Sequence, residues 1–206
     1  MDFLVTLLVP DFGQGPALYS GTEPPVCGTR CVLDQEGTLD IGTVCASRPM
    51  EKGDRPPITR LLRTATAEDD RAAKACEKAS VEALSAFTAL AAKYNLQTRA
   101  VQAHVFLGRN RLVLWHRPQA SLPDLRSFEG EFRRKVRCIV DLREVGPRET
   151  AALFGGCGCC GRPLCCTRGR MPPRELPPQE MPLRASAPSP MAVNGLCNCP
   201  KCCLGF

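Results

Sequence analysis

TAEDDRAAKACEKASVEALSAFTALAAKYN, residues 66–95, carries the longest helical pattern of the chain. Thr66 followed three positions later by Asp69 is typical of a capping box, in which each side chain bonds the other residue's backbone N–H. Apolar side chains then recur at helical spacing on one face: Ala73, Cys76, Ala79, Ser80, Ala83, Leu84, Phe87, Leu90 and Tyr94. We therefore expect a long helix that ends near Asn95, with Cys76 as a small buried hydrophobe rather than a ligand.

A hairpin, a second helix and a third strand are predicted after this helix. Apolar and polar residues alternate over residues 101–107 and 112–116, with turn residues between them, which indicates a β-hairpin. Phe128 and Phe132 mark the buried side of a second helix, and alternation over residues 136–142 indicates another strand. The order helix, strand, strand, helix, strand predicts an α+β sandwich with its helices on one face of the sheet.

Residues 1–57 show short apolar segments separated by glycine and proline. The segments 3–9, 31–33 and 39–44 are predicted strands, and the polar, proline-containing residues 51–57 form a boundary. This pattern is typical of a small antiparallel sheet or barrel. The fold class is thus predicted to be α+β, with a β-rich N-terminal region.

The C-terminal region is rich in cysteine and proline. It holds nine of the 14 cysteines, and seven prolines lie between residues 171 and 190. Proline at this density is incompatible with a helix or a central strand, so we interpret 171–190 as an extended connector between two Cys clusters. Three regions are expected: 1–57 (β-rich), 58–154 (α+β) and 155–206 (irregular, Cys-rich and metal-binding).

The N-terminus and the lengths of the apolar stretches favour a cytoplasmic protein. Asp2 stands where a secretory signal peptide needs positive charge, and no apolar stretch approaches the length of a membrane span. Thiols stay reduced in the cytoplasm, which favours metal ligation over disulfides.

The net charge of +6 is modest. Basic residues between 126 and 174 permit RNA or DNA contact, but solvated helix ends are the favoured interpretation.

The two Cys clusters resemble each other. Cys160 followed by the pair Cys165-Cys166 matches Cys197 followed by the pair Cys202-Cys203. Both lie on short loops with glycine or proline turns, which let thiolates converge and leave backbone N–H groups free to bond sulfur. An internal duplication of this kind would bring two half-sites together.

The spacing leaves the identity of the metal open. Cys157 with Cys160, and Cys199 with Cys202, supply the C-x-x-C spacing of zinc knuckles. The adjacent Cys-Cys pairs fit simple knuckles poorly, and nine thiols exceed one zinc site. Iron–sulfur clusters are held by Cys thiolates at more varied spacings, so an iron–sulfur cluster is favoured and zinc is the alternative.

Several short segments resemble the YaaT/RicT family, the bacterial family with a polymerase-suppressor-type C-terminal domain. They are EVGPRE at 144–149, GG at 155–156, CGRPLCC at 160–166, GLC at 195–197 and CCL at 202–204. The order of the upstream elements is also similar, so the resemblance covers most of the chain.

The resemblance implies a non-enzymatic subunit of a cytoplasmic complex. Members of the family act with two small partner proteins, bind [4Fe–4S] clusters and modulate the endoribonuclease RNase Y, and hence mRNA processing; in sporulating bacteria they also affect the phosphorelay and biofilm formation. The ligand candidates that it implies are Cys160, Cys165, Cys166, Cys197, Cys202 and Cys203. Cys157, Cys159 and Cys199 are extra thiols at positions where the family has other residues, and they are candidates to enlarge the site.

Two other functions are weighed against this one. A zinc-bound nucleic-acid-binding module would use the C-x-x-C pairs and the basic residues between 126 and 174. A redox or cluster-transfer enzyme has no His-Cys pair, paired acidic motif or phosphate-binding loop to support it. His104 and His116 lie on predicted strands with no acidic or Cys neighbour in the sequence, so we interpret both as solvated or internally satisfied histidines.

Overall fold

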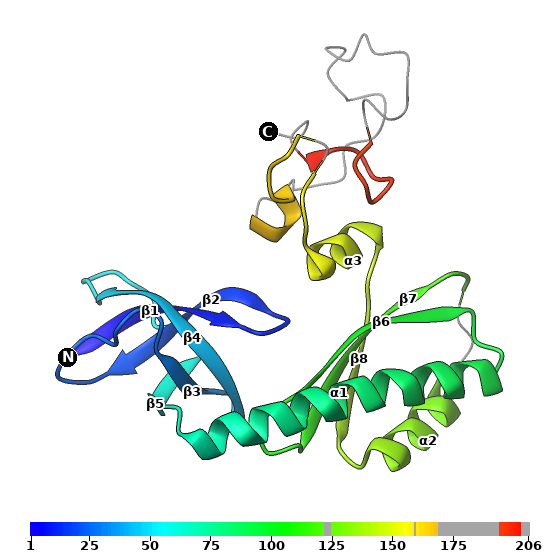
Figure 1. Ribbon diagram of the computed structural model, residues 1–206, viewed down its shortest axis with the longest axis horizontal. Coiled ribbons are helices and arrows are strands. Elements are labelled where there is room, and N and C mark those ends of the chain that lie inside the picture. The colour runs from blue at the N-terminus through cyan, green and yellow to red at the C-terminus, as the bar shows by residue number, and fades with distance from the viewer. Residues whose placement is uncertain (122–124, 159, 169–193, 203–206) are drawn as a thin grey trace, which may run out of the picture. The chain divides into compact units, whose positions relative to one another are not determined.

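A computed structural model shows the fold (Figure 1). It describes residues 1–121, 125–158, 160–168 and 194–202. The chain divides into two compact units, residues 1–143 and residues 144–206. The α+β class predicted from the sequence is confirmed.

Five strands form a closed barrel in the first unit, in the order β1-β2-β5-β3-β4. Their bounds are β1 Asp2–Val9, β2 Gly13–Ser20, β3 Arg30–Gln35, β4 Thr38–Pro49 and β5 Arg60–Thr64. The neighbours are antiparallel except β2 and β5, which are parallel. Side chains that alternate along the strands fill the interior: Phe3, Val5, Leu7, Ala17, Cys31, Leu33, Val44 and Leu61.

Two barrel strands, β2 and β5, were not predicted from the sequence. Residues 13–15 contain two glycines and lie outside the predicted strands, yet they begin β2 and pair with Val9, Leu8 and Leu7 of β1. Glycine and proline lower the strand propensity of β2, but a continuous ladder to β1 compensates for it. β5 has only five residues, too few for a clear alternation.

The predicted helix–strand order is confirmed in the rest of the first unit. α1 spans Ala67–Lys93, β6 Thr98–Val105, β7 Arg111–Pro118, α2 Arg126–Val136 and β8 Ile139–Glu144. The three strands form a sheet in the order β6-β7-β8, with α1 and α2 on one side of it (Figure 1). Thr66 caps α1, and the predicted capping box with Asp69 is present.

An aromatic cluster fixes the helices on this sheet. The ring of Phe87 on α1 meets the rings of Phe128 and Phe132 on α2 edge-on, at centroid distances of 5.1 and 5.6 Å. Cys76 is buried in the same core and donates to the backbone carbonyl of Phe106. It is therefore part of the packing, as the sequence predicted.

The second unit contains a short helix and two loops. α3 spans Pro147–Phe154, and the carboxylate of Glu149 accepts a hydrogen bond from the backbone N–H of Gly146 (2.8 Å) just before it. A 3-10 turn, η1, covers Cys165–Arg168. The predicted connector at 171–190 lies outside the described residues. None of the helices described here is long and apolar enough to cross a membrane.

Candidate metal centre

The first Cys cluster folds into a tight knuckle. Cys157 and Pro163 form an antiparallel bridge. Inside it the N–H of Gly158 donates to the carbonyl of Arg162 (2.8 Å), and the N–H of Gly161 donates to the carbonyl of Gly158 (3.0 Å). Gly161 has a φ of +73°, a conformation that glycine adopts without strain. The knuckle presents Cys160 at its tip and leads directly into Cys165 and Cys166.

The second Cys cluster repeats this geometry 37 positions later. Asn194 and Pro200 form the equivalent bridge, and the N–H of Gly195 donates to the carbonyl of Cys199 (2.8 Å). The N–H of Asn198 donates to the carbonyl of Gly195 (3.0 Å), and Asn198 takes the left-handed conformation at φ +60°. Asparagine tolerates this conformation better than other non-glycine residues. The duplication seen in the sequence is thus also present in the backbone.

The predicted ligands differ in exposure. Cys157 and Cys160 are exposed, whereas the other described cysteines of the tail are half-buried: Cys165, Cys166, Cys197, Cys199 and Cys202. Cys159 and Cys203 lie outside the described residues.

Thiols of the two half-sites influence the ionisation of Cys166 and Cys202. The thiol of Cys202 interacts with those of Cys165, Cys166 and Cys197, and Cys166 interacts with Cys165 and Cys197. Burial raises the pKa of both Cys166 and Cys202, and the neighbouring thiols raise it further. Thiols of both half-sites therefore contribute to the raised pKa of Cys166 and of Cys202.

Backbone donors are present at the same place. The N–H groups of Cys166 and Thr167 hydrogen-bond the sulfur of Cys166 and oppose the rise of its pKa. N–H to sulfur bonds of this kind stabilise thiolate ligands and tune the metal that they hold.

A buried arginine bonds the second knuckle, close to Cys202 in the sequence. Arg148 on α3 is only 8% exposed, and its guanidinium donates to the carbonyl of Pro200 in the second knuckle (3.2 Å). Its charge acts on Cys202 and lowers the pKa of that thiol, against the larger effect of burial. The Nε of Arg148 is buried and has no hydrogen-bond partner among the described residues.

These residues supply thiol donors that suit a metal centre, but they are not arranged as a complete metal site. Within the described parts of the chain, no three His, Cys, Asp or Glu side chains are grouped closely enough to hold an ion. The donor chemistry nevertheless suits such a centre, because thiols of both half-sites act on the ionisation of Cys166 and Cys202, and Arg148, a buried cation with an unused donor, bonds the second knuckle. A thiolate centre with a net negative charge would satisfy that donor.

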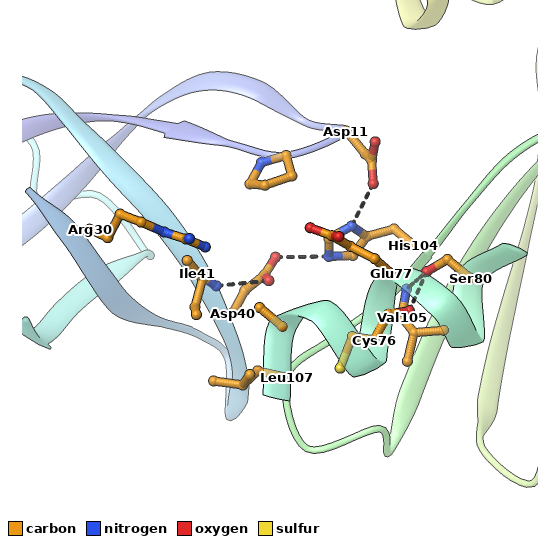
Figure 2. Close-up of a pocket in the computed structure, with 12 residues that line it drawn as sticks. Asp11, Arg30, Asp40, Ile41, Cys76, Glu77, Ser80, His104, Val105 and Leu107 are labelled. Carbon is orange, nitrogen blue, oxygen red and sulfur yellow. Dashed lines mark hydrogen bonds and ion pairs between the residues drawn. The ribbon is translucent and has the colours of Figure 1, made fainter. Parts of the chain in front are cut away.

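A second polar cluster, in the first unit, was missed in the sequence. His104 on β6 is buried, with Nδ1 2.8 Å from the carboxylate of Asp11 and Nε2 3.0 Å from the carboxylate of Asp40. Figure 2 shows the imidazole between these carboxylates, at the edge of a pocket that α1 lines with Cys76 and Glu77.

The ionisation of His104 follows from these contacts. Burial lowers its pKa, but the hydrogen bonds to Asp11 and Asp40 outweigh burial and raise the pKa from 6.5 to about 9. His104 is thus internally satisfied, one of the two interpretations made from the sequence. Its partners lie 93 and 64 positions away, so no local pattern could have identified them.

Comparisons with known proteins give one match. Over 114 residues the chain is 30% identical to "Stage 0 sporulation protein YaaT" of Bacillus subtilis (strain 168). The matched stretch is 54% of this chain and spans only 40% of that protein's length. No family model matches the chain, and no solved structure matches it.

Proposed function

We propose that this chain, which is similar to YaaT over part of its length, is a non-enzymatic regulatory subunit that holds an iron–sulfur cluster in its tail. The observation that supports the proposal is the pair of matching knuckles, whose cysteines Cys165, Cys166, Cys197 and Cys202 influence one another's ionisation. A backbone geometry repeated after 37 positions has no evident use in packing, whereas converging thiols are what a metal centre needs.

The chain's own residues would divide the work of holding the cluster. The thiols of Cys165, Cys166, Cys197 and Cys202 are the first candidates for ligands, and Cys160 and Cys203 complete the set implied by the resemblance. The N–H groups of Cys166 and Thr167 stabilise the sulfur charge. A bound [4Fe–4S] cluster supplies one-electron redox chemistry and a rigid cross-link.

A centre built from two half-sites suits regulation. It joins segments that are 37 positions apart, so its assembly or loss changes the order of the tail without disturbing the separate core of the first unit. The tail would then bind its partners only when the centre is intact. We propose that these partners are small subunits of a cytoplasmic complex together with an endoribonuclease, RNase Y, and that the complex modulates mRNA processing during sporulation.

Anaerobic purification with iron, sulfide and zinc analysis tests the metal. We expect a brown protein that contains iron and sulfide, and Cys202→Ser should lose both. Cys27→Ser is the matched control, because Cys27 is exposed and lies in the first unit. A colourless wild-type protein with stoichiometric zinc would refute the iron–sulfur assignment.

The proposed role in RNA processing needs a separate experiment. If the cluster acts through RNA processing, a strain carrying Cys202→Ser should show the same altered transcript ends as a strain that lacks the chain. The Cys27→Ser strain should resemble the wild type. Unchanged transcript ends in the strain that lacks the chain would refute the RNA-processing role and leave the metal site standing.

Zinc is the alternative centre, and one observation favours it. Four thiols are a complete tetrahedral zinc set, and Cys199 and Cys202 have knuckle spacing. The last turn of α2 carries Arg133, Arg134 and Lys135, which would supply a basic surface for nucleic acid. This alternative predicts RNA affinity that falls steeply with rising salt.

A further inference from the structure

The position of Arg148 in the second unit suggests a role beyond packing. Its side chain is 8% exposed although it ends in a charge, and buried arginines are rare unless that charge is compensated. No carboxylate among the described residues pairs with it. Its guanidinium donates to the carbonyl of Pro200, two residues before Cys202, and its charge lowers the pKa of the Cys202 thiol.

The placement of Arg148 follows from local structure. Gly146 and Pro147 start α3, and the bond from the N–H of Gly146 to Glu149 fixes its first turn. Arg148 is the second residue of this helix, so a rigid element aims its side chain. Since α3 leads directly into the first knuckle while Arg148 bonds the second, this one side chain links the two half-sites.

The charge of a filled centre gives the guanidinium its partner. Four thiolates contribute four negative charges, and either Zn²⁺ or a [4Fe–4S]²⁺ core neutralises only two of them. The remaining negative charge would lie in a partly buried space, where a neighbouring cation stabilises it strongly. The unused Nε–H of Arg148 is a donor of the kind that bonds a thiolate sulfur.

We propose that Arg148 is the positioning residue of this centre: its guanidinium holds the second half-site through Pro200 and offers its Nε–H and its charge to the thiolates. The inference rests on the proposed function, in that the tail must hold a metal–thiolate centre. It does not require that the metal be iron.

The test compares Arg148→Gln, Arg148→Lys and Arg162→Gln with the wild-type chain after anaerobic reconstitution with iron and sulfide. Arg162 is the matched control, because it lies in the first knuckle and is exposed. Three quantities are measured: iron and sulfide per chain, loss of iron to a competing chelator, and the midpoint potential of the cluster. The helix signal in circular dichroism verifies that each variant is folded.

We expect Arg148→Gln to lose iron to the chelator about 10- to 100-fold more readily than the wild type, as for other groups that support metal ligands. Its remaining cluster should have a more negative midpoint potential, because a nearby cation favours the reduced, more negative state. Arg148→Lys keeps the charge and should retain a potential near that of the wild type, while its single donor group makes it intermediate in iron retention. Arg162→Gln should match the wild type.

Two results would overturn the inference about Arg148. One is an Arg148→Gln protein that cannot be distinguished from Arg162→Gln in iron retention and potential. The other is an Arg148→Lys protein that loses its cluster as completely as Arg148→Gln, since charge would then not be what the centre needs. A wild-type chain that binds zinc and no iron refutes the proposed iron–sulfur function instead, and zinc competition on the same variants then tests Arg148.

Discussion

The Nε2 of His104 on β6 lies 3.0 Å from the carboxylate of Asp40 on β4, so one imidazole joins the sheet to the barrel. Asp11, at the turn between β1 and β2, bonds the other ring nitrogen. The ring of Phe12, next to Asp11, meets the rings of His104 and Trp115 edge-on. The two parts of the first unit are therefore connected by a buried charged group as well as by apolar contacts.

Stability should depend on pH through His104. Its pKa is raised from 6.5 to about 9 in the folded chain. The stabilising contribution is therefore fully present below pH 6.5 and is lost as the pH rises through 9, because the unfolded chain releases this proton first. The full effect is on the order of 3 kcal/mol. Urea unfolding between pH 6 and 10 measures it.

His104→Gln isolates this effect. The variant keeps a polar side chain of similar size but cannot carry the charge, so its free energy of unfolding should be lower at pH 6 and should change little between pH 6 and 8. Above pH 8, buried thiols such as Cys31, whose pKa is raised to about 11, lower the stability of both proteins. His116→Gln is the control, because the other histidine is also buried but bonds the hydroxyl of Thr98 rather than a carboxylate. A wild-type curve that rises with pH would contradict the assignment.

The N-terminus of α1 offers a second measurement. The hydroxyl of Thr66 accepts a bond from the backbone N–H of Asp69, and the carboxylate of Asp69 in turn bonds Arg63 on β5. Thr66→Ala removes the cap and should lower the free energy of unfolding by about 1 kcal/mol. Thr88→Ala, at an exposed position inside the same helix, should change it little. Equal effects in both variants would show that the cap contributes nothing.

The sequence was informative where one element carries its own pattern. The cap at Thr66 and the apolar stripe through Cys76 and Phe87 are local, so α1 could be predicted within a residue or two at each end. β2 and β5 could not, because their strand state depends on pairing with residues far along the chain. The ion pairs of His104 could not be predicted for the same reason, because Asp11 and Asp40 come close to it only in the folded chain.

The candidate metal centre contains one feature that could be predicted from the sequence and one that could not. The repeat of Cys160 and Cys165 in Cys197 and Cys202 could be recognised because the spacing itself is periodic. Arg148 could not be identified as a buried neighbour of the thiols, because an arginine in the sequence usually indicates a solvated surface. Only the bond from its guanidinium to Pro200 places it at the centre.

Thiol reactivity should follow burial. Cys27 is exposed, whereas Cys31 is 1% exposed and burial raises its pKa to about 11, opposed only by a backbone hydrogen bond. Because the thiolate is the reactive form, iodoacetamide should modify Cys27 in the folded protein long before Cys31 or Cys76. Mass spectrometry of timed samples measures the order. Urea-unfolded protein, in which all three should react alike, is the control, and rapid modification of folded Cys31 would contradict the barrel packing.

Removal of the metal should affect the second unit alone. The first unit has its own cores, one inside the barrel and one between α1, α2 and the sheet, and neither contains a cysteine of the tail. Chelation under reducing conditions should therefore leave the helix signal in circular dichroism almost unchanged, because α1 and α2 carry most of it. The two knuckles, residues 157–163 and 194–200, are each held by a few backbone hydrogen bonds and would lose the link between them.

Limited digestion with a protease of broad specificity measures whether chelation affects the second unit and spares the first. The metal-loaded chain should resist cleavage within the two knuckles, residues 157–163 and 194–200, while the chelated chain should be cut there and leave a fragment that still unfolds cooperatively. Cys202→Ser should be trimmed without chelation, and Cys27→Ser should behave as the wild type does. If chelation removes the helix signal along with the tail, the metal stabilises the whole chain, and a switch confined to the tail is the wrong description of this centre.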